Sequence, residues 1–222
     1  MGTNTLAEVA MERLETELRG AVLQPGDPAY ESARQVWNGM IDERPAVITR
    51  PTGVADVRTA VDVAGDADVP VAVRGGGHSV AGTAVADDSL VVDLSEMASV
   101  RVNREERTVR VQGGATWGDV DHETRPFGLV VPGGVVSTTG VAGLTLGGGY
   151  GWTRRKWGLT CDNLRSAEVV TADGDVVTAS ETENEDLFWA LRGGGGNFGI
   201  VTSFEFDAHE LGPEVYFCGA LY

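Results

Sequence analysis

The chain has 222 residues, of which 42% are hydrophobic, and this is enough apolar material for one sizeable core or two small lobes. Asp and Glu total 33 against 17 Lys and Arg, so the net charge is −16 and the pI is about 4.5. A charge of this sign and size argues against nucleic acid and anionic membrane surfaces as partners.

Lysine is almost absent, since Lys156 is the only one in the chain. Abundant Asp and Glu, with Arg in place of Lys, is the composition of proteins that stay soluble in very high salt. We therefore expect a halophilic source. A GC-rich genome that favours Arg over Lys is the alternative explanation, and the two do not exclude each other.

Cysteine content and hydropathy indicate what kinds of site and cellular location to expect. Cys161 and Cys218 are too few for a disulfide framework and lack the spacing of zinc ligands, so no metal site is expected. No N-terminal signal pattern and no apolar run of membrane-spanning length is found in the sequence. We expect a soluble, cytoplasmic protein.

The first part of the chain alternates helices and strands, as judged from apolar periodicity and from Pro and Gly turns. The predicted elements are a helix over 5–18, a turn over 24–30, a short helix over 31–37, a strand over 46–49, a helix over 54–64 and a strand over 69–73. The last three of these form a β-α-β unit.

The second part mixes strands and helices without a regular order. The predicted elements are a strand over 89–94, a hairpin over 100–111 with its turn at 103–106, a helix over 116–123, a hairpin over 167–179, a helix over 183–191 and a strand over 200–206. Asp173-Gly174 is a strong turn signal for the second hairpin. The irregular order favours an α+β fold of two lobes over a doubly wound sheet.

A glycine-rich loop follows the predicted strand over 69–73. The sequence VAVRGGGHSVAG at 71–82 places three consecutive glycines directly before His78 and Ser79. Glycine adopts positive φ and lets backbone N–H groups approach an anion, so we expect the N–H groups of residues 75–79 to bind one. A tight turn with His78 at the surface is the alternative reading.

Two further stretches are rich in glycine. Residues 128–151 are dense in Gly, Thr, Ser and Val and almost free of charge, so in this acidic chain we expect them to be buried against a ligand. Gly194, Gly196 and Gly199 formally satisfy the dinucleotide pattern GxGxxG. That pattern requires a preceding strand and a following helix, whereas a helix precedes and a strand follows here, so we reject a Rossmann interpretation.

Three motifs in order carry a resemblance to a known family. They are RGGGHS at 74–79, PGGVVSTTGVAGLTLGGGYGWTRRKWGLTCDNL at 132–164 and DLFWALRGGGGNFGIVTSFEF at 186–206. Together they span roughly residues 45–210 and resemble the FAD-binding domain of the vanillyl-alcohol oxidase superfamily. Within it, the chain is most similar to the berberine-bridge-enzyme-like branch of FAD-linked oxidases.

The resemblance implies a two-lobed, PCMH-type α+β fold, with a small β-α-β lobe and a larger mixed lobe whose sheet is mainly antiparallel. The expected organisation is an N-terminal helical segment at 1–41 and an FAD-binding domain at 42–213. Lobe one covers about 42–97 and lobe two about 98–213. Residues 214–222 then begin a substrate-binding domain that this chain does not contain.

The resemblance also implies a set of FAD-binding residues. The matching residues are Arg74, Gly75, Gly76, Gly77, His78, Ser79, Gly82, Pro132, Gly133, Thr138, Thr139, Gly140, Gly143, Gly148, Gly149, Tyr150, Gly151, Ile200 and Val201. In related flavoproteins the histidine of the first motif is bonded covalently to the 8-methyl group of the flavin. That bond requires a neutral imidazole with a free ring nitrogen. A non-bonded contact of His78 with FAD is the alternative.

A second covalent bond is not expected. Some members of the branch carry a cysteine just before the TTG-like turn, where this chain has Val136. Cys161 lies well past that position and is expected to be a small buried residue.

The remaining aromatic and basic residues have plainer interpretations. Arg154, Arg155 and Lys156 form a basic cluster, read as surface ion-pair partners or as phosphate contacts. We expect Tyr150, Trp152 and Trp157 to be packing residues, and His122 and His209 to be solvated.

The function implied by the resemblance is oxidation of an alcohol, sugar or amine carbon in a small-molecule substrate by hydride transfer to FAD, with reoxidation by oxygen or another acceptor. The sequence identifies no catalytic base. A non-catalytic FAD-binding or interaction module is the alternative. A third reading is a homodimer, or association with a substrate domain or another subunit, through an uncovered apolar face.

Overall fold

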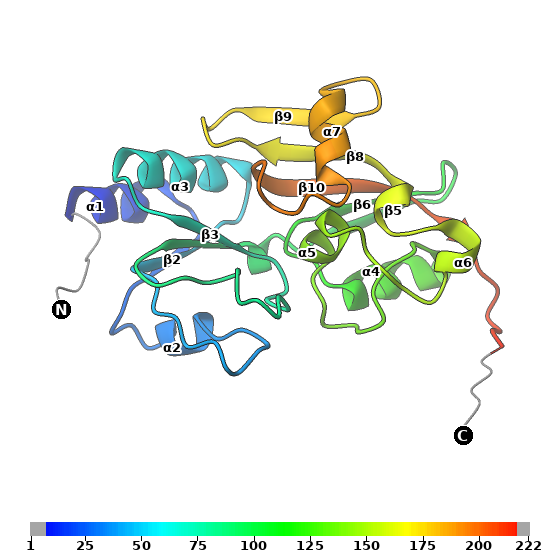
Figure 1. The fold of residues 1–222 in the computed structure, drawn as a ribbon, viewed down its shortest axis with the longest axis horizontal. Coiled ribbons are helices and arrows are strands. Elements are labelled where there is room, and N and C mark those ends of the chain that lie inside the picture. The colour runs from blue at the N-terminus through cyan, green and yellow to red at the C-terminus, as the bar shows by residue number, and fades with distance from the viewer. Residues whose placement is uncertain (1–7, 217–222) are drawn as a thin grey trace.

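A four-stranded sheet forms the first of two lobes in the computed structural model, which describes residues 8–216 (Figure 1). The strand order is β1-β2-β4-β3, with β2, β4 and β3 parallel and β1 antiparallel to β2. The elements of this lobe are α1 (Glu8–Glu17), β1 (Ala21–Leu23), α2 (Tyr30–Ala33), β2 (Val47–Arg50), α3 (Val54–Asp66), β3 (Val71–Arg74), β4 (Leu90–Asp93) and the 3-10 helix η1 (Leu94–Glu96).

Helices cover both faces of this sheet. Figure 1 shows α1 and α3 side by side on one face and α2 on the other. Strand β4 is therefore buried along its whole length, as is typical of an apolar strand in a parallel sheet. Helix α3 buries Val57, Ala60, Val61 and Ala64 at helical spacing. The predicted β-α-β unit is confirmed.

A buried carboxylate ties the N-terminal segment to this lobe. Asp56 in α3 accepts the backbone N–H groups of Arg19 and Gly20 at 3.2 Å and that of Thr52 at 2.9 Å. Burial alone would raise the pKa of Asp56, but these N–H donors outweigh burial and lower it. Strand β1 and helix α1 are thus fastened to the sheet and to α3.

A five-stranded antiparallel sheet of order β5-β6-β10-β8-β9 forms the second lobe. Its elements are β5 (Val100–Asn103), β6 (Thr108–Gln112), α4 (Trp117–Thr124), η2 (Arg125–Phe127), β7 (Leu129–Val130), α5 (Val141–Leu146), α6 (Arg154–Trp157), η3 (Cys161–Asn163), β8 (Leu164–Val170), β9 (Val176–Ser180), α7 (Glu185–Leu191), β10 (Ile200–Asp207) and β11 (His209–Glu210). Strands β7 and β11 pair separately. The predicted two-lobed α+β fold is confirmed.

Local signals in the sequence account for several of these elements. Both predicted hairpins are present as β5-β6 and β8-β9. Gly174 in the second turn has a φ of +76°, which glycine adopts without strain. Helix α4 begins with a capping box, in which the Asp119 side chain accepts the Thr116 N–H and the Thr116 side chain accepts the Asp119 N–H.

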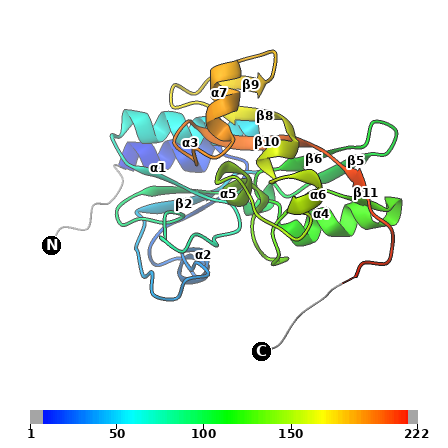
Figure 2. The same cartoon turned by 45° about the vertical axis from the view of Figure 1, so that its right-hand side comes forward.

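The two lobes share packed residues. Val170 at the end of β8 and Ile200 at the start of β10 are buried in the same apolar cluster as α3 and β4 of the first lobe. The Arg58 guanidinium of α3 also donates to the Gly174 carbonyl across the boundary, at 2.7 Å. The view in Figure 2 shows α3 lying next to the β8-β10 side of the second sheet.

One predicted helix is shorter than expected. The helix expected over 31–37 ends at Ala33, and Trp37 lies in the irregular segment that follows. The Trp37 N–H donates to the Gly77 carbonyl at 3.0 Å instead of continuing the helix. Tertiary contacts therefore override the local helical preference. Several short elements were not predicted from the sequence, namely β1, α5, α6, β7 and β11.

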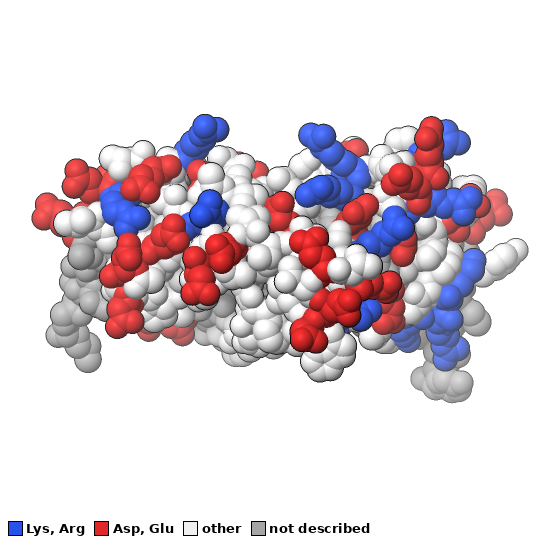
Figure 3. All heavy atoms as spheres, turned by 90° about the horizontal axis from the view of Figure 1, so that it is seen from above, with Lys and Arg blue, Asp and Glu red and all other residues white. Residues whose placement is uncertain are grey.

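The surface carries charges of both signs. Figure 3 shows acidic side chains over both lobes with basic side chains interspersed among them on that face. Among the helices of residues 8–216, none combines the length and the apolar character that crossing a bilayer requires.

Candidate functional site

The glycine loop after β3 meets the second lobe backbone to backbone. A Cβ atom added to Gly76 would lie 2.7 Å from the Gly140 Cα and 3.1 Å from the Thr138 carbonyl oxygen. A Cβ atom added to Gly140 would in turn overlap the Gly76 backbone. Glycine is therefore required on both sides of this contact, which brings the first and second sequence motifs together at the lobe boundary.

Unpaired backbone donors collect in this loop. Within residues 8–216, the consecutive N–H groups of Gly75 to Ser79 donate to no acceptor. Gly77 has a φ of +67°, which turns the loop at its centre. Successive free N–H groups around a turn of this kind form an anion-binding concavity. The residues present thus fit the diphosphate of FAD.

Arg74 has a different place from the one expected. Its guanidinium group donates to the Ala33 carbonyl at the end of α2. Its Nε atom lies beside Gly77, 3.3 Å from where a Cβ atom would be. Arg74 therefore ties α2 to the glycine loop, and the free backbone N–H groups are the donors left for an anion.

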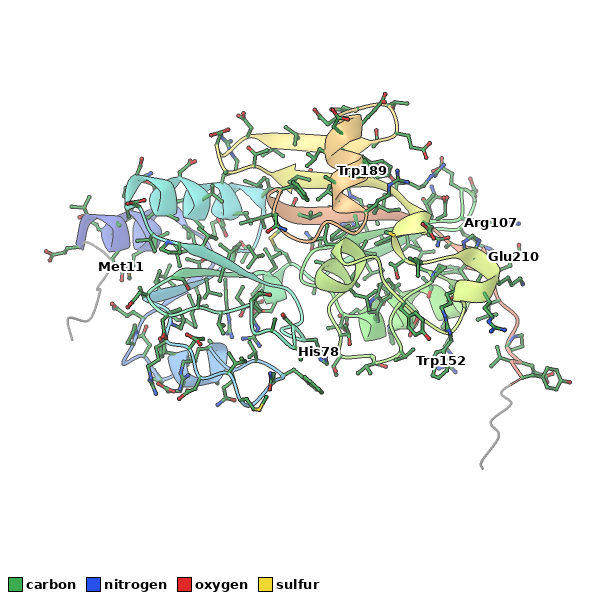
Figure 4. The ribbon with its side chains drawn as sticks, in the orientation of Figure 1. Met11, His78, Arg107, Trp152, Trp189 and Glu210 are labelled. Atoms are coloured by element: carbon green, nitrogen blue, oxygen red, sulfur yellow. The ribbon has the colours of Figure 1, made fainter. Side chains whose placement is uncertain are left out.

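His78 lies between two threonines of the second motif and a tryptophan of the first lobe. Its Nε2 atom is 3.0 Å from Thr138 Oγ1 and its Nδ1 atom is 3.5 Å from Thr139 Oγ1. The Trp37 ring stacks on the imidazole, with centroids 5.5 Å apart and planes 20° apart. Figure 4 shows His78 at the lobe boundary, far from Trp189 on α7. His78 and both threonines are among the residues predicted to bind FAD, whereas Trp37 was not predicted.

Several glycines of the second motif are explained by packing within the protein. A Cβ atom on Gly133 would lie 2.6 Å from Cδ2 of the Trp117 ring, and one on Gly151 would overlap the Gly133 carbonyl. A Cβ atom on Gly149 would lie 2.8 Å from Leu144 Cδ2. These positions therefore need glycine whether or not a ligand is bound. Pro132 is likewise buried beside them.

Gly143 differs from these glycines. It is exposed in the middle of α5, and a Cβ atom there would meet nothing within 4 Å. Glycine in a helix interior costs about 1 kcal/mol relative to alanine. The space over Gly143 therefore suits a ligand that comes close to the backbone. Gly148, which follows α5 closely, has a φ of +102°.

The other predicted contacts vary in accessibility. Ile200 and Val201 are buried in the two cores and pair with Val170 and Val169 of β8, so the structure gives their side chains a packing role. Gly82 has a φ of +79°, and a Cβ atom there would lie 2.7 Å from Ile41 Cδ1. The Ser79 and Thr83 hydroxyl oxygens are 3.0 Å apart.

Two aromatic residues expected to be packing residues are largely exposed in this structure. Trp152 is 72% exposed, and Tyr150 is 60% exposed with the Arg154 guanidinium 3.9 Å over its ring. Lys156 similarly lies 4.4 Å from the centre of the Trp157 ring. Within the described part of the chain, Arg154 and Lys156 thus contact aromatic rings and form no ion pairs.

Cys161 is buried, as predicted, and burial raises the pKa of its thiol. It is therefore a poor nucleophile. Cys218 and the last residues of the chain lie outside the described range. No group of three or more His, Cys, Asp or Glu side chains in residues 8–216 is placed to hold a metal ion.

His209 was expected to be solvated, but the structure packs its side chain against other residues. Its ring stacks on Trp157 with centroids 4.8 Å apart, and its Nε2 atom lies 2.6 Å from Asn163 Oδ1. The Asn163 side-chain NH2 donates to the Trp157 and Leu159 carbonyls, so Oδ1 is the acceptor and His209 Nε2 carries the proton. This network fastens α6 to β11. The residues concerned are far apart in sequence, so no local pattern predicts it.

The His209 network makes stability depend on pH. Burial lowers the pKa of His209, Asp207 opposes this effect and Lys156 adds to it. Because the folded pKa lies below the unfolded value of about 6.5, the neutral ring contributes stability above that pH and loses it as the pH falls. We expect the melting temperatures of the native protein and His209→Phe to converge as the pH falls from about 7.5 to 5.5.

The matched control for this prediction is His122→Phe, because the His122 side chain is 84% exposed and pairs only with its neighbour Glu123. The melting temperature of His122→Phe measures how much replacing an exposed histidine by phenylalanine changes stability at each pH. A constant difference for His209→Phe over that range would contradict the prediction.

Comparisons with known proteins agree with this geometry. A family model described as an FAD binding domain matches residues 45–180. (R)-6-hydroxynicotine oxidase of Paenarthrobacter nicotinovorans is 38% identical over 194 residues, which cover 87% of this chain and 42% of that protein.

Solved structures extend the comparison. BBE-like 1 of Physcomitrella patens matches with a TM-score of 0.87 and 35% identity, over 90% of this chain and 44% of that chain. A glucooligosaccharide oxidase of Acremonium strictum, described with a 6-S-cysteinyl, 8 alpha-N1-histidyl FAD, matches with a TM-score of 0.86 and 36% identity, over 90% of this chain and 42% of that chain.

The chain thus spans less than half the length of each of these relatives. The predicted resemblance to berberine-bridge-enzyme-like flavoproteins is confirmed by their similarity in sequence and fold. The chain belongs to the FAD binding domain family.

Proposed function

We propose that the chain is the flavin-binding part of an FAD-linked oxidase and holds FAD at the lobe boundary beside Gly75–His78. The observation that carries this proposal is the run of unpaired backbone N–H groups from Gly75 to Ser79, in direct contact with the second motif at Gly140. Such donors bind a diphosphate without needing cationic side chains. That property suits a chain of net charge −16.

The residues around the loop have distinct roles in this proposal. The backbone N–H groups bind the diphosphate, and the open face of Gly143 admits the cofactor close to α5. His78 attaches the flavin covalently, and Val136 leaves no second attachment at the position where some family members have cysteine. Bound FAD supplies the capacity to accept two electrons as a hydride.

The substrate class we propose is a small molecule with an oxidisable alcohol, sugar or amine carbon, with oxygen or another acceptor taking the electrons. Relatives named as a hydroxynicotine oxidase and a glucooligosaccharide oxidase support this range. The second candidate is a flavin-binding module without turnover. The cytoplasmic location, the domain limits and the homodimer or association with a substrate domain stay predictions.

Titration of the purified chain with FAD, followed by flavin absorption and fluorescence, tests the proposal. We expect saturable binding of one FAD per chain, and loss of the flavin colour when a suitable alcohol, sugar or amine is added without oxygen. Binding without bleaching by any of these classes favours the module. No binding overturns the proposal.

The same titration at low and high KCl tests the expected adaptation to salt. At low ionic strength the excess of negative charge repels itself and the anionic cofactor, and salt screens both effects. Tighter FAD binding at high KCl supports the adaptation. Weaker binding at high KCl contradicts it.

A further inference from the structure

We propose that Trp37 and Asn38 form a clamp that holds the glycine loop and sets the ring of His78 in position for covalent attachment of the flavin. This inference rests on the proposed function, in which His78 carries FAD. It assigns a role to the segment between α2 and β2, where the sequence analysis predicted the end of a helix.

The clamp contacts the loop on both sides of His78. The Trp37 N–H donates to the Gly77 carbonyl at 3.0 Å, one residue before the histidine. The Asn38 side-chain NH2 donates to the Val80 carbonyl at 2.9 Å, two residues after it. Asn38 Oδ1 accepts the Met40 N–H at 3.2 Å, which orients the amide so that its NH2 group faces Val80. The backbone carrying His78 is therefore held at two points.

The Trp37 ring orients the imidazole itself. It stacks on one face of His78 while Trp37 remains 65% exposed, so burial in a core does not explain its place. In a neutral imidazole the lone pair that can bond to carbon lies in the plane of the ring, so a ring stacked on the face does not block it. The Thr138 and Thr139 hydroxyls approach the edges of the imidazole from the second lobe. Together these contacts restrict the ring to one orientation.

A fixed ring matters because attachment requires alignment of a nitrogen lone pair with a carbon atom. One ring nitrogen of His78 forms an N–C bond to the 8-methyl carbon of FAD, and one C–H bond of that methyl group breaks. The other ring nitrogen gives up its proton to solvent, with a threonine hydroxyl as its first acceptor. The two protons and the electron pair released in these steps reduce dioxygen to hydrogen peroxide.

The test compares the rate of covalent attachment in three variants after mixing with FAD in air. Trp37→Ala should attach flavin about tenfold more slowly, because the interaction free energy of a stacked aromatic pair corresponds to about that change in rate. Trp37→Phe, which keeps a stacked ring, should recover most of the rate. Trp189→Ala removes a tryptophan that is 75% exposed far from His78 and should attach at the native rate.

A second readout separates positioning from a general effect on folding. The dissociation constant for FAD before attachment and the melting temperature should change little in Trp37→Ala. Asn38→Ala removes the side-chain bonds to Val80 and Met40 and should slow attachment about threefold, so the proposal stays testable if Trp37→Ala does not fold.

The outcomes separate the clamp from the proposed function. Equal attachment rates in the native protein and in the Trp37 and Asn38 variants overturn the clamp and leave the proposed function intact. Parallel losses of attachment rate, FAD affinity and melting temperature also overturn it, because they indicate a merely structural role. Absence of covalent flavin in the native protein overturns the clamp and the attachment role of His78, whereas absence of FAD binding overturns the proposed function itself.

Discussion

Replacing His78 by alanine is expected to abolish covalent attachment of flavin while the protein still folds and binds FAD. The imidazole is only partly buried, and its contacts are one stacked ring and two threonine hydroxyls. Its loss should therefore cost about 1 kcal/mol of stability. The N–H groups that we assign to the diphosphate belong to the backbone and remain in the variant.

The measurement is acid precipitation of the FAD-loaded variant, followed by flavin absorption of the pellet and the supernatant. All flavin should be released to the supernatant. The control His122→Ala removes an exposed histidine and should behave as the native protein does. Flavin that stays with the precipitated His78→Ala protein would exclude His78 as the attachment residue.

Alanine at Gly76 is expected to destabilise the protein by about 3 kcal/mol and to abolish FAD binding. The added Cβ atom would lie 2.7 Å from the Gly140 Cα, and backbone on both sides leaves no flexible side chain to move away. The glycine loop and the second motif must then separate. Chemical denaturation measures the first effect and FAD titration the second.

Gly143→Ala is the matched control for Gly76→Ala, since it adds the same methyl group where nothing lies within 4 Å. Alanine favours the helix, so the free energy of unfolding should rise by up to about 1 kcal/mol. FAD binding should nevertheless weaken, because the methyl group enters the space proposed for the cofactor. Equal changes in the free energy of unfolding of the two variants would contradict the claim that the contact with Gly140 requires glycine at position 76. Unchanged FAD affinity in Gly143→Ala would show that α5 is not part of the FAD site.

The elements that the sequence predicted well depend on local signals. The hairpin at Asp173-Gly174, the helix that follows Thr116 and the β-α-β unit each arise from neighbouring residues whose preferences agree with the fold. The helix expected over 31–37 failed because Trp37 contacts a loop forty residues later, and tertiary contacts of that kind leave no periodic pattern.

The site was predictable in part. The resemblance assigned His78, Thr138 and Thr139 to FAD binding on two separate motifs, and the structure brings these residues together. The motifs did not reveal Trp37, which none of them includes. The motifs also assigned their matching glycines to contact with FAD. In the structure, Gly133 and Gly151 pack against other parts of the protein, whereas Gly143 faces open space. The sequence shows where glycine occurs, but only the folded structure shows which atoms a side chain at that position would contact.

The most direct test of the central claim is acid precipitation of the native chain after incubation with FAD in air, with mass spectrometry of the flavin-bearing peptide. The account predicts that the yellow colour stays with the pellet and that the flavin maps to the peptide containing His78. Flavin released entirely to the supernatant, or attached to any other residue, would contradict it.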